Sequence, residues 1–225
     1  MAEVGAPDPG VLLLIDKPYR WTSFDVVKKV RNVGKYAKIG HAGTLDPLAT
    51  GLLILCTGKM TKQIDTFQAQ EKEYTGTMVL GKTTPSFDLE TEVDGVYETN
   101  HITEVLLHEG IGQLSGPIQQ IPPIYSALQV NGERLYKKAR RGEMIEIQPR
   151  EVLISSFELT RVAMPEIDFR VVCSKGTYIR SLVRDFGMAV QSGAHLSALR
   201  RTRIGAFNVS DAMTIEKLTE SHSRV

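Results

Sequence analysis

One carboxylic acid and one imidazole, Asp46 and His41, lie in a stretch from Gly40 to Gly51. Such side chains serve as nucleophiles or as acids and bases in enzymes. The stretch contains three glycines and a proline in its twelve residues, which excludes a regular helix or central strand and predicts a shaped loop. The apolar run 52–56 that follows predicts a buried strand. Reactive groups are often held on loops tied to such a strand, although Asp before Pro also occurs in plain turns.

The other reactive side chains favour no metal or cofactor site. Cys56 and Cys173 each lie inside an apolar run, which indicates buried free thiols and a reducing compartment. His101 and His108 fall on a predicted helix with no third ligand nearby. The glycines from Gly51 onward are too widely spaced for a phosphate-binding loop, and Met60 stands where that motif needs Ser or Thr. We therefore expect no cofactor.

Basic residues gather in three segments that could contact RNA phosphates or simply face water. A helix predicted from about residue 24 to 38 is rich in lysine. The densest patch, residues 132–141, surrounds Leu135 and Tyr136 with Arg134, Lys137, Lys138, Arg140 and Arg141. A strand predicted over 199–207 carries Arg200 and Arg201. In contrast, the acidic run 88–94 is predicted to be a solvated loop away from RNA.

The remaining elements follow from apolar periodicity. Strands are expected at 11–15, 73–80, 152–162 and 167–173, the last two being antiparallel neighbours joined near Met164 and Pro165. Helices are expected at 61–67, 102–114, 175–192 and 214–218. Strands and helices in this mixed order predict a globular core with both kinds of element.

The bulk composition is that of an ordinary globular protein. At 225 residues the chain can bury a core without disulfides. Its formal net charge of +1 excludes a grossly basic nucleic-acid binder but not a basic face. The acidic, proline-bearing start lacks the pattern of a secretory signal, and no apolar run approaches the ~20 residues of a membrane span. We expect a cytoplasmic protein without membrane contact.

The stretch from Gly40 to Gly51 resembles the catalytic loop of the TruB family, the tRNA pseudouridine-55 synthases, whose pattern is G-H-x-G-x-L-D-P-x-A-x-G. Every fixed position of that pattern is present. Three further blocks resemble the family in the same order: Asp16-Lys17-Pro18 after the first strand, P-P-x-Y-S-A-L-x-x-x-G-x-x-x-Y-x-x-A-R-x-G from residue 122, and K-G-T-Y-I-R from residue 175. The resemblance covers about residues 11 to 217.

This resemblance implies a role for each matching residue. Asp46 is implied to be the essential catalytic residue, acting either as nucleophile or as the base that removes a ribose proton. Arg180 would supply the cation that keeps Asp46 ionised, since burial favours a neutral carboxyl. The implied roles of the others are stacking on the flipped base for Tyr74, a hydrogen bond near the acid for Tyr178, lining of the base pocket for Leu199, and occupation of the space left by the flipped nucleotides for His41.

The expected RNA-binding residues are His41, Lys17, Arg134, Lys137, Lys138, Arg140, Arg141, Arg200 and Arg201. Of these, Lys17 matches a family lysine that supports the fold around the site, and we expect its role to be structural. The implied partner is the T stem-loop of tRNA, bound by a monomer with no obligate protein partner. Two alternatives remain: a protein that binds and folds the tRNA elbow, and the same isomerisation on another RNA.

The implied fold is the α+β pseudouridine synthase fold: a long, mixed but largely antiparallel sheet with flanking helices and a central active-site cleft. We expect a flexible N-terminus over 1–10, a single catalytic domain over 11–218 and a tail over 219–225. Many family members carry a C-terminal PUA domain that holds the acceptor arm, and none is expected here. Affinity should then rest on the T stem-loop alone.

Overall fold

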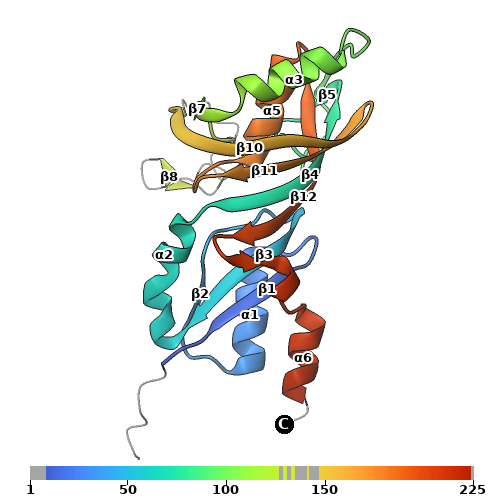
Figure 1. Ribbon diagram of the computed structural model, residues 1–225. Helices are drawn as coiled ribbons and strands as arrows, with labels where there is room; N and C mark the ends of the chain where they lie inside the picture. The colour runs from blue at the N-terminus through green and yellow to red at the C-terminus, as the bar shows by residue number, and fades with distance from the viewer. Residues whose placement is uncertain (1–8, 127–128, 131–132, 135–140, 142–146, 224–225) are drawn as a thin grey trace, which may run out of the picture. The chain divides into compact units, whose positions relative to one another are not determined.

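The computed structural model of the chain describes residues 9–126, 129–130, 133–134, 141 and 147–223. By its contacts the chain divides into two compact units. Unit 1 is made of residues 1–74 together with 199–225, and unit 2 of residues 75–198. Each unit is described by itself. Figure 1 labels the elements.

Strand β3 (Ala49–Thr57) is the centre of unit 1. It pairs antiparallel with β1 (Leu12–Lys17) and with the short β2 (Ile39–His41). The later strand β12 (Ala194–Ile204) runs parallel to β3 and places Leu199, Arg200 and Arg201 beside residues 49, 50 and 51. A short β13 (Phe207–Asn208) completes the pairing on β12. Strand pairing thus brings residues about 150 positions apart in the sequence into register.

Strand β3 is buried on both faces, as its continuous apolar sequence predicts. Because side chains alternate along a strand, Leu53 and Leu55 face one way and Leu52, Ile54 and Cys56 the other. The first face packs against α1 (Ser23–Gly34) and α6 (Ile215–Ser223). The second packs with Phe67 of α2 (Ile64–Ala69), which follows the 3-10 turn η1 (Gly58–Gln63). The strand that follows the Asp46 loop is therefore fixed from both sides.

Unit 2 is built on β4 (Lys72–Leu80), which enters from unit 1, followed by β11 (Glu166–Cys173), β10 (Arg150–Ala163) and β7 (Gly116–Gln120) in spatial order. Strand β10 pairs antiparallel with both β11 and β7. The β10–β11 hairpin turns at Met164 and Pro165, as predicted. Two short pairs accompany this sheet, β5 (Lys82–Thr83) with β6 (Gly95–Val96) and β8 (Gln129–Val130) with β9 (Glu133–Arg134).

Helices α3 (Glu104–Gln113) and α5 (Ile179–Ala189) contact each other in unit 2 (Figure 1). Phe186 of α5 packs edge-on against Phe157 of β10, which packs in the same way against Phe169 of β11. Such edge-to-face contacts add to the area that the rings bury. They fix α5, which carries Arg180, against the sheet.

Several boundaries differ from the sequence prediction. Helix α1 ends at Gly34 rather than near 38, because Lys35 takes the left-handed conformation and its N–H bonds the Arg31 carbonyl. Helix α5 begins at Ile179 rather than 175, since Gly176 has a positive φ of 83°. Strand β12 begins five residues earlier than predicted, and α6 continues to Ser223 past the expected domain end at 218.

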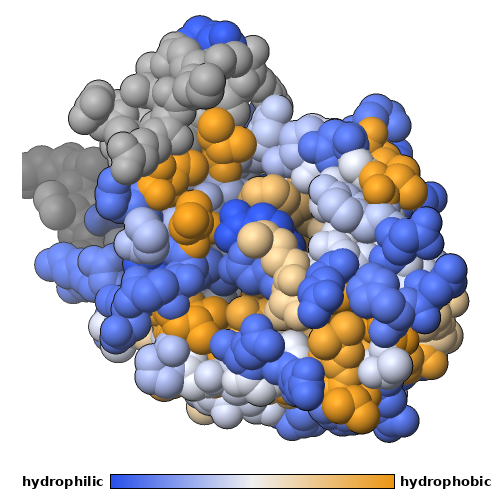
Figure 2. Space-filling view, turned by 90° about the horizontal axis from the view of Figure 1, so that it is seen from above, coloured by the Kyte–Doolittle hydropathy of each residue, from blue (hydrophilic) through white to orange (hydrophobic). Residues whose placement is uncertain are grey.

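The parallel β3–β12 pair among antiparallel neighbours makes the sheet mixed and mostly antiparallel, with helices packed beside it. This confirms the predicted α+β fold class. Figure 2 shows hydrophobic and hydrophilic side chains intermingled over one face of the molecule. Exposed apolar residues scattered in this way are normal for a globular protein.

Candidate active site

The loop that carries Asp46 is held at both ends by strand pairing. His41 is the last residue of β2 and lies opposite Leu55, and the N–H of Ala42 donates to the carbonyl of Ile54 at 2.9 Å. At the other end the N–H of Ala49 donates to the carbonyl of Asp46 at 3.0 Å, which closes a turn. The side chain of Asp46 is half-buried. The acid is thus carried on a short backbone path between two paired strands.

Gly51 allows the neighbouring strands to approach the loop closely. Its φ is +103°, and a Cβ there would lie 2.3 Å from the carbonyl oxygen of Arg201. Only glycine fits both conditions. In the sheet register its neighbours are Lys17 on β1 and Arg201 on β12. The two basic residues therefore flank the same point, just after Asp46.

Both of these basic side chains are buried and donate to backbone carbonyls of the loop. Arg201 is 1% exposed, and its guanidinium donates to the carbonyls of Leu52 (2.8 Å), Gly43 (3.1 Å) and Thr44 (3.4 Å). Lys17 is fully buried, and its ammonium donates to the carbonyls of Trp21 (2.6 Å), Pro18 (3.1 Å) and Pro47 (3.3 Å). Burying a cation requires such a full set of acceptors. These acceptors also fix the loop.

The burial of Lys17 and Arg201 revises one expectation. Both were counted among the RNA-binding residues, but charges enclosed and bonded in this way do not face a phosphate. Their place in unit 1 is to support the Asp46 loop. For Lys17 this agrees with the structural role that the resemblance implied.

The charge of Lys17 is sensitive to its surroundings. Burial lowers its pKa from 10.5 to about 8, and the nearby carboxylate of Asp46 opposes this shift while Arg201 adds to it. Asp46 and Lys17 thus interact electrostatically within unit 1.

The segment before α1 is tied to the same loop. Ser23, which is buried, accepts from the N–H of Leu45 at 2.9 Å and donates to its carbonyl at 3.3 Å. The N–H of Arg20 donates to the carbonyl of Pro47 at 2.9 Å. Thr22 forms a reciprocal capping box with Asp25, which fixes the start of the helix. The loop is therefore held from three elements, β1, α1 and β12.

The other expected site residues of unit 1 have different environments. Burial and the charge of Arg201 lower the pKa of His41, so a neutral imidazole is favoured at neutral pH. Tyr74 on β4 is 8% exposed. Leu199 is half-buried beside Ala49, and its carbonyl accepts from Thr50 at 3.4 Å. The partly exposed Arg200 forms a bidentate ion pair with Asp16 at 2.7 and 3.0 Å.

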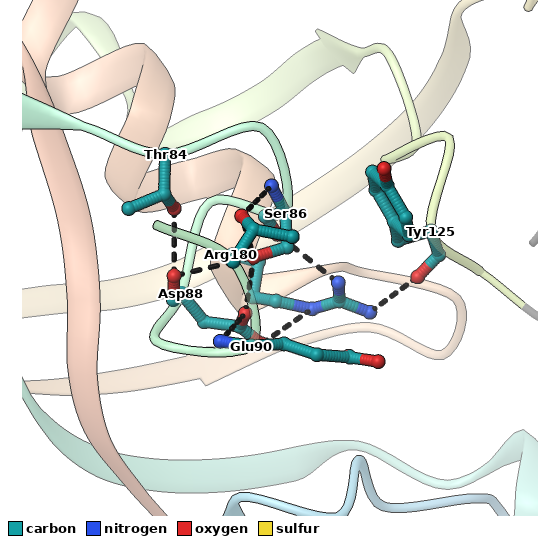
Figure 3. Close-up of polar contacts among 7 residues, drawn as sticks. Thr84, Ser86, Asp88, Glu90, Tyr125 and Arg180 are labelled. Carbon is teal, nitrogen blue, oxygen red and sulfur yellow. Dashed lines mark hydrogen bonds and ion pairs between the residues drawn. The ribbon is translucent and has the colours of Figure 1, made fainter. Parts of the chain in front are cut away.

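In unit 2, Arg180 lies in the first turn of α5 and is 3% exposed. Its guanidinium donates to the carbonyls of Tyr125 (2.9 Å) and Ser86 (3.1 Å), and its Nε lies 3.7 Å from the carboxylate of Asp88. Figure 3 shows the loop of residues 84–90 folded around this group, with Tyr125 on the other side. The arginine is a buried member of a polar network, as a site residue would be.

Asp88 is a residue whose importance the sequence analysis missed. It was predicted to lie in a solvated acidic loop, but it is 4% exposed and accepts hydrogen bonds from the Ser86 hydroxyl at 2.6 Å and the Glu90 N–H at 2.9 Å. The hydroxyl of Thr84 donates to its carbonyl at 2.6 Å. Four acids within seven residues gave no signal that one of them faces inward. The prediction for Asp88 was wrong because its carboxylate lies in the interior beside the buried Arg180.

The basic patch at 132–141 lies largely outside the described residues. Lys137, Lys138 and Arg140 are not among them, and Arg134 is described only as part of β9. Arg141 is exposed. Their contact with RNA stays a prediction.

Among the described residues, no group of three or more His, Cys, Asp or Glu side chains could hold a metal ion. Nor is any helix in that part of the chain long and apolar enough to span a membrane.

Replacing Lys17 should change how stability depends on pH. Native Lys17 releases its proton near pH 8, whereas an unfolded lysine does so near 10.5. Between these values the unfolded chain binds more protons, so wild-type stability gains with pH, by up to about 1.4 kcal/mol per pH unit. In Lys17→Met this gain is absent. Urea unfolding measures the free energy of unfolding of both proteins. The wild-type value minus the variant value should grow with pH above about pH 8 and stay constant below it.

An exposed lysine of the same unit, Lys62, provides the control. Lys62→Met should keep the wild-type pH profile. A difference between wild type and Lys17→Met that is constant across this pH range would show that Lys17 keeps an ordinary pKa.

Comparison with known proteins identifies the family. The model of the TruB family pseudouridylate synthase N-terminal domain matches residues 31–179, and that of the tRNA pseudouridylate synthase B C-terminal domain matches residues 180–224. The chain is therefore a pseudouridine synthase, an enzyme that isomerises uridine in RNA. Within this class it belongs to the TruB family.

Individual relatives agree with this assignment. The tRNA pseudouridine synthase B of Flavobacterium johnsoniae is 59% identical over 219 residues, which cover 94% of this chain and 96% of the relative. That of Phocaeicola vulgatus is 52% identical, covering 94% and 92%.

Solved structures agree as well. A chain of a Cbf5-Nop10-Gar1 complex matches with a TM-score of 0.73 at 28% identity, over 93% of this chain and 53% of that chain. A chain of an H/ACA RNP bound to a substrate RNA containing 2'-deoxyuridine matches with a TM-score of 0.70 at 26% identity, over 93% and 52%. This protein thus spans about half the length of those two chains.

Proposed function

We propose that this enzyme converts uridine 55 in the T loop of tRNA into pseudouridine, with Asp46 as its essential catalytic residue. Relatives named tRNA pseudouridine synthase B share half or more of its residues along nearly their whole length. At such identity, substrate class is commonly retained.

The observation that carries the role of Asp46 is the way its loop is held. Buried donors on Lys17 and Arg201 bond the carbonyls of Pro47, Gly43 and Thr44, on both sides of the acid. A reactive group on a loop held from both sides loses little conformational entropy when it meets the substrate.

The reaction breaks the bond between C1′ of the ribose and N1 of uracil and joins C1′ to C5 of the same base. The proton leaves C5 and N1 ends protonated, so atoms and electrons balance without an oxidant or a cofactor. The carboxylate of Asp46 can attack the nucleotide or remove a ribose proton. Both routes begin from the same ionised side chain.

The other site residues have supporting roles in this proposal. Tyr74 stacks on the flipped base, Leu199 lines its pocket and Tyr178 hydrogen-bonds near the acid. His41, neutral at the working pH, fills the space that the flipped nucleotide leaves. Arg180 balances the charge of Asp46. We expect the enzyme to act as a monomer on the T stem-loop, in the cytoplasm where tRNA is found.

Carbodiimide primer-extension mapping tests this proposal. An unmodified tRNA transcript is incubated with the enzyme, and a transcript with cytidine in place of uridine 55 serves as control. A new stop at position 55 of the first transcript alone is expected. A stop at another uridine, or none at all, would refute the assignment of position 55.

A second candidate is the same isomerisation on another RNA, favoured by the likeness to a chain solved in an H/ACA RNP with a substrate RNA. Mapping total RNA incubated with the enzyme separates the two. Stops confined to tRNA support the first candidate, and stops in other RNAs with unmodified tRNA support the second.

A further inference from the structure

Tyr178 starts helix α5 without a cap of its own. It is the N-cap residue and its side chain makes no capping hydrogen bond. A side chain from strand β7 instead holds the backbone of Tyr178 itself. Gln120, at the end of β7, accepts from the N–H of Tyr178 at 2.8 Å and donates to its carbonyl at 3.1 Å. Gln120 is fully buried, so both groups are satisfied by each other away from water.

Arg150 holds the ring of the same tyrosine. Its guanidinium carbon lies 4.7 Å from the centroid of the Tyr178 ring, within the range of a cation–π contact. Its Nε and Nη2 atoms are buried and have no hydrogen-bond partner within the described residues. Two buried donors without a hydrogen-bond partner are costly unless another attraction compensates. The ring face of Tyr178 provides that attraction.

Gln120 and Arg150 act on Tyr178 from the same pair of strands. Gln120 and Arg150 are register partners on the antiparallel strands β7 and β10. The turn before α5 lies beside the arginine, since a Cβ on Gly176 would lie 3.7 Å from its Nη1. One strand pair therefore holds the backbone of Tyr178 with one residue and its ring with the other. Both side chains contact the residue that starts α5, Gln120 by hydrogen bonds to its backbone and Arg150 by a cation–π contact with its ring.

We propose that Gln120 and Arg150 are positioning residues that set the orientation of Tyr178 for the reaction, and this inference rests on the proposed function. A hydrogen bond from a phenol depends on where its ring points. The tyrosine has one backbone conformation and one ring placement available while this strand pair holds it. The two residues act on the rate through Tyr178 and do not contact the RNA themselves.

The first test separates rate from binding. Arg150→Met and Gln120→Met should lower the single-turnover rate of pseudouridine formation between about 10- and 100-fold, as misplaced catalytic groups do, with the RNA Kd unchanged. Gln119→Met on β7 and Arg161→Met on β10, both at exposed positions of the same two strands, are matched controls that should keep the wild-type rate. Equal rates in all four variants would overturn the inference.

A double-mutant cycle shows whether Arg150 acts through Tyr178. Arg150→Met should slow the wild-type enzyme but add no further loss in a Tyr178→Ala background. Independent, multiplying losses would show a general structural role and overturn the inference. Arg150→Lys, which keeps the charge but not the planar group, should recover part of the rate.

A measurement without chemistry keeps the inference separate from the proposed function. With fluorotyrosine incorporated at the seven tyrosines, the Tyr178 resonance is assigned through Tyr178→Phe. We expect one sharp line in wild type and a shifted or split line in Arg150→Met and Gln120→Met, but not in the controls. An unchanged line refutes the positioning role. An inactive wild type with the expected lines refutes only the proposed function.

Discussion

Asp46→Asn should lower the rate of pseudouridine formation by about ten-thousand-fold or more, since an amide is neither a nucleophile nor a base at neutral pH. The substitution keeps the size and shape of the side chain. The Lys17 and Arg201 hydrogen bonds to the loop go to backbone carbonyls, so they remain. Folding and RNA binding should therefore persist. Primer-extension mapping gives the rate, and filter binding gives the Kd.

The control is Asp65→Asn, at an exposed aspartate of α2 in the same unit, which should behave like wild type. This comparison also separates the enzyme from the alternative of a protein that binds and folds the tRNA elbow. If Asp46→Asn retained wild-type pseudouridine formation, another residue would have to carry the chemistry.

Asp88→Ala should cost unit 2 between about 3 and 5 kcal/mol of stability, as is typical when one partner of a buried charge pair is removed. Arg180 is 3% exposed and would keep its carbonyl acceptors but lose the Asp88 carboxylate that lies 3.7 Å from its Nε (Figure 3). The Ser86 hydroxyl and the Glu90 N–H would lose their acceptor as well. Urea denaturation measures the change in the free energy of unfolding.

Glu92→Ala supplies the comparison, since Glu92 is exposed in the same acidic loop. It should change stability by less than about 0.5 kcal/mol. Asp88→Asn, which keeps the shape and the acceptor oxygen, should fall between the two. Equal effects of Asp88→Ala and Glu92→Ala would mean that the loop is solvated after all, as its composition suggested.

The Asp46 loop could be predicted because its signals are local, whereas the fold class came from the resemblance to the TruB family. Glycines and a proline in close succession indicate a loop, and the apolar run of β3 indicates a buried strand. The position of Asp46 on a loop just before a buried strand followed from these features, but strand β2 before the loop was not predicted. The boundaries were less accurate, because the ends of α1 and α5 depend on a left-handed Lys35 and on the turn at Gly176.

Residues whose role comes from a distant partner could not be predicted in this way. Arg201 resembles any basic strand residue until the parallel pairing of β12 with β3 places it against the loop. In the sequence Asp88 resembles its acidic neighbours, and only the fold places it beside Arg180. Gln120 and Arg150 carry no motif, and only the pairing of β7 with β10 places both beside Tyr178. The spacing of residues along the sequence gives no information about these pairings.

The parallel β3–β12 pair has a consequence for how the enzyme comes into being. The guanidinium that holds Gly43 and Thr44 belongs to a residue 157 or 158 positions further along the chain. The ribosome synthesises the chain from its N-terminus, so the Asp46 loop is made before Arg201, the residue that supports it. Contacts of such long separation also form slowly. A nascent chain therefore carries its acid long before the arginine that supports the Asp46 loop has been made.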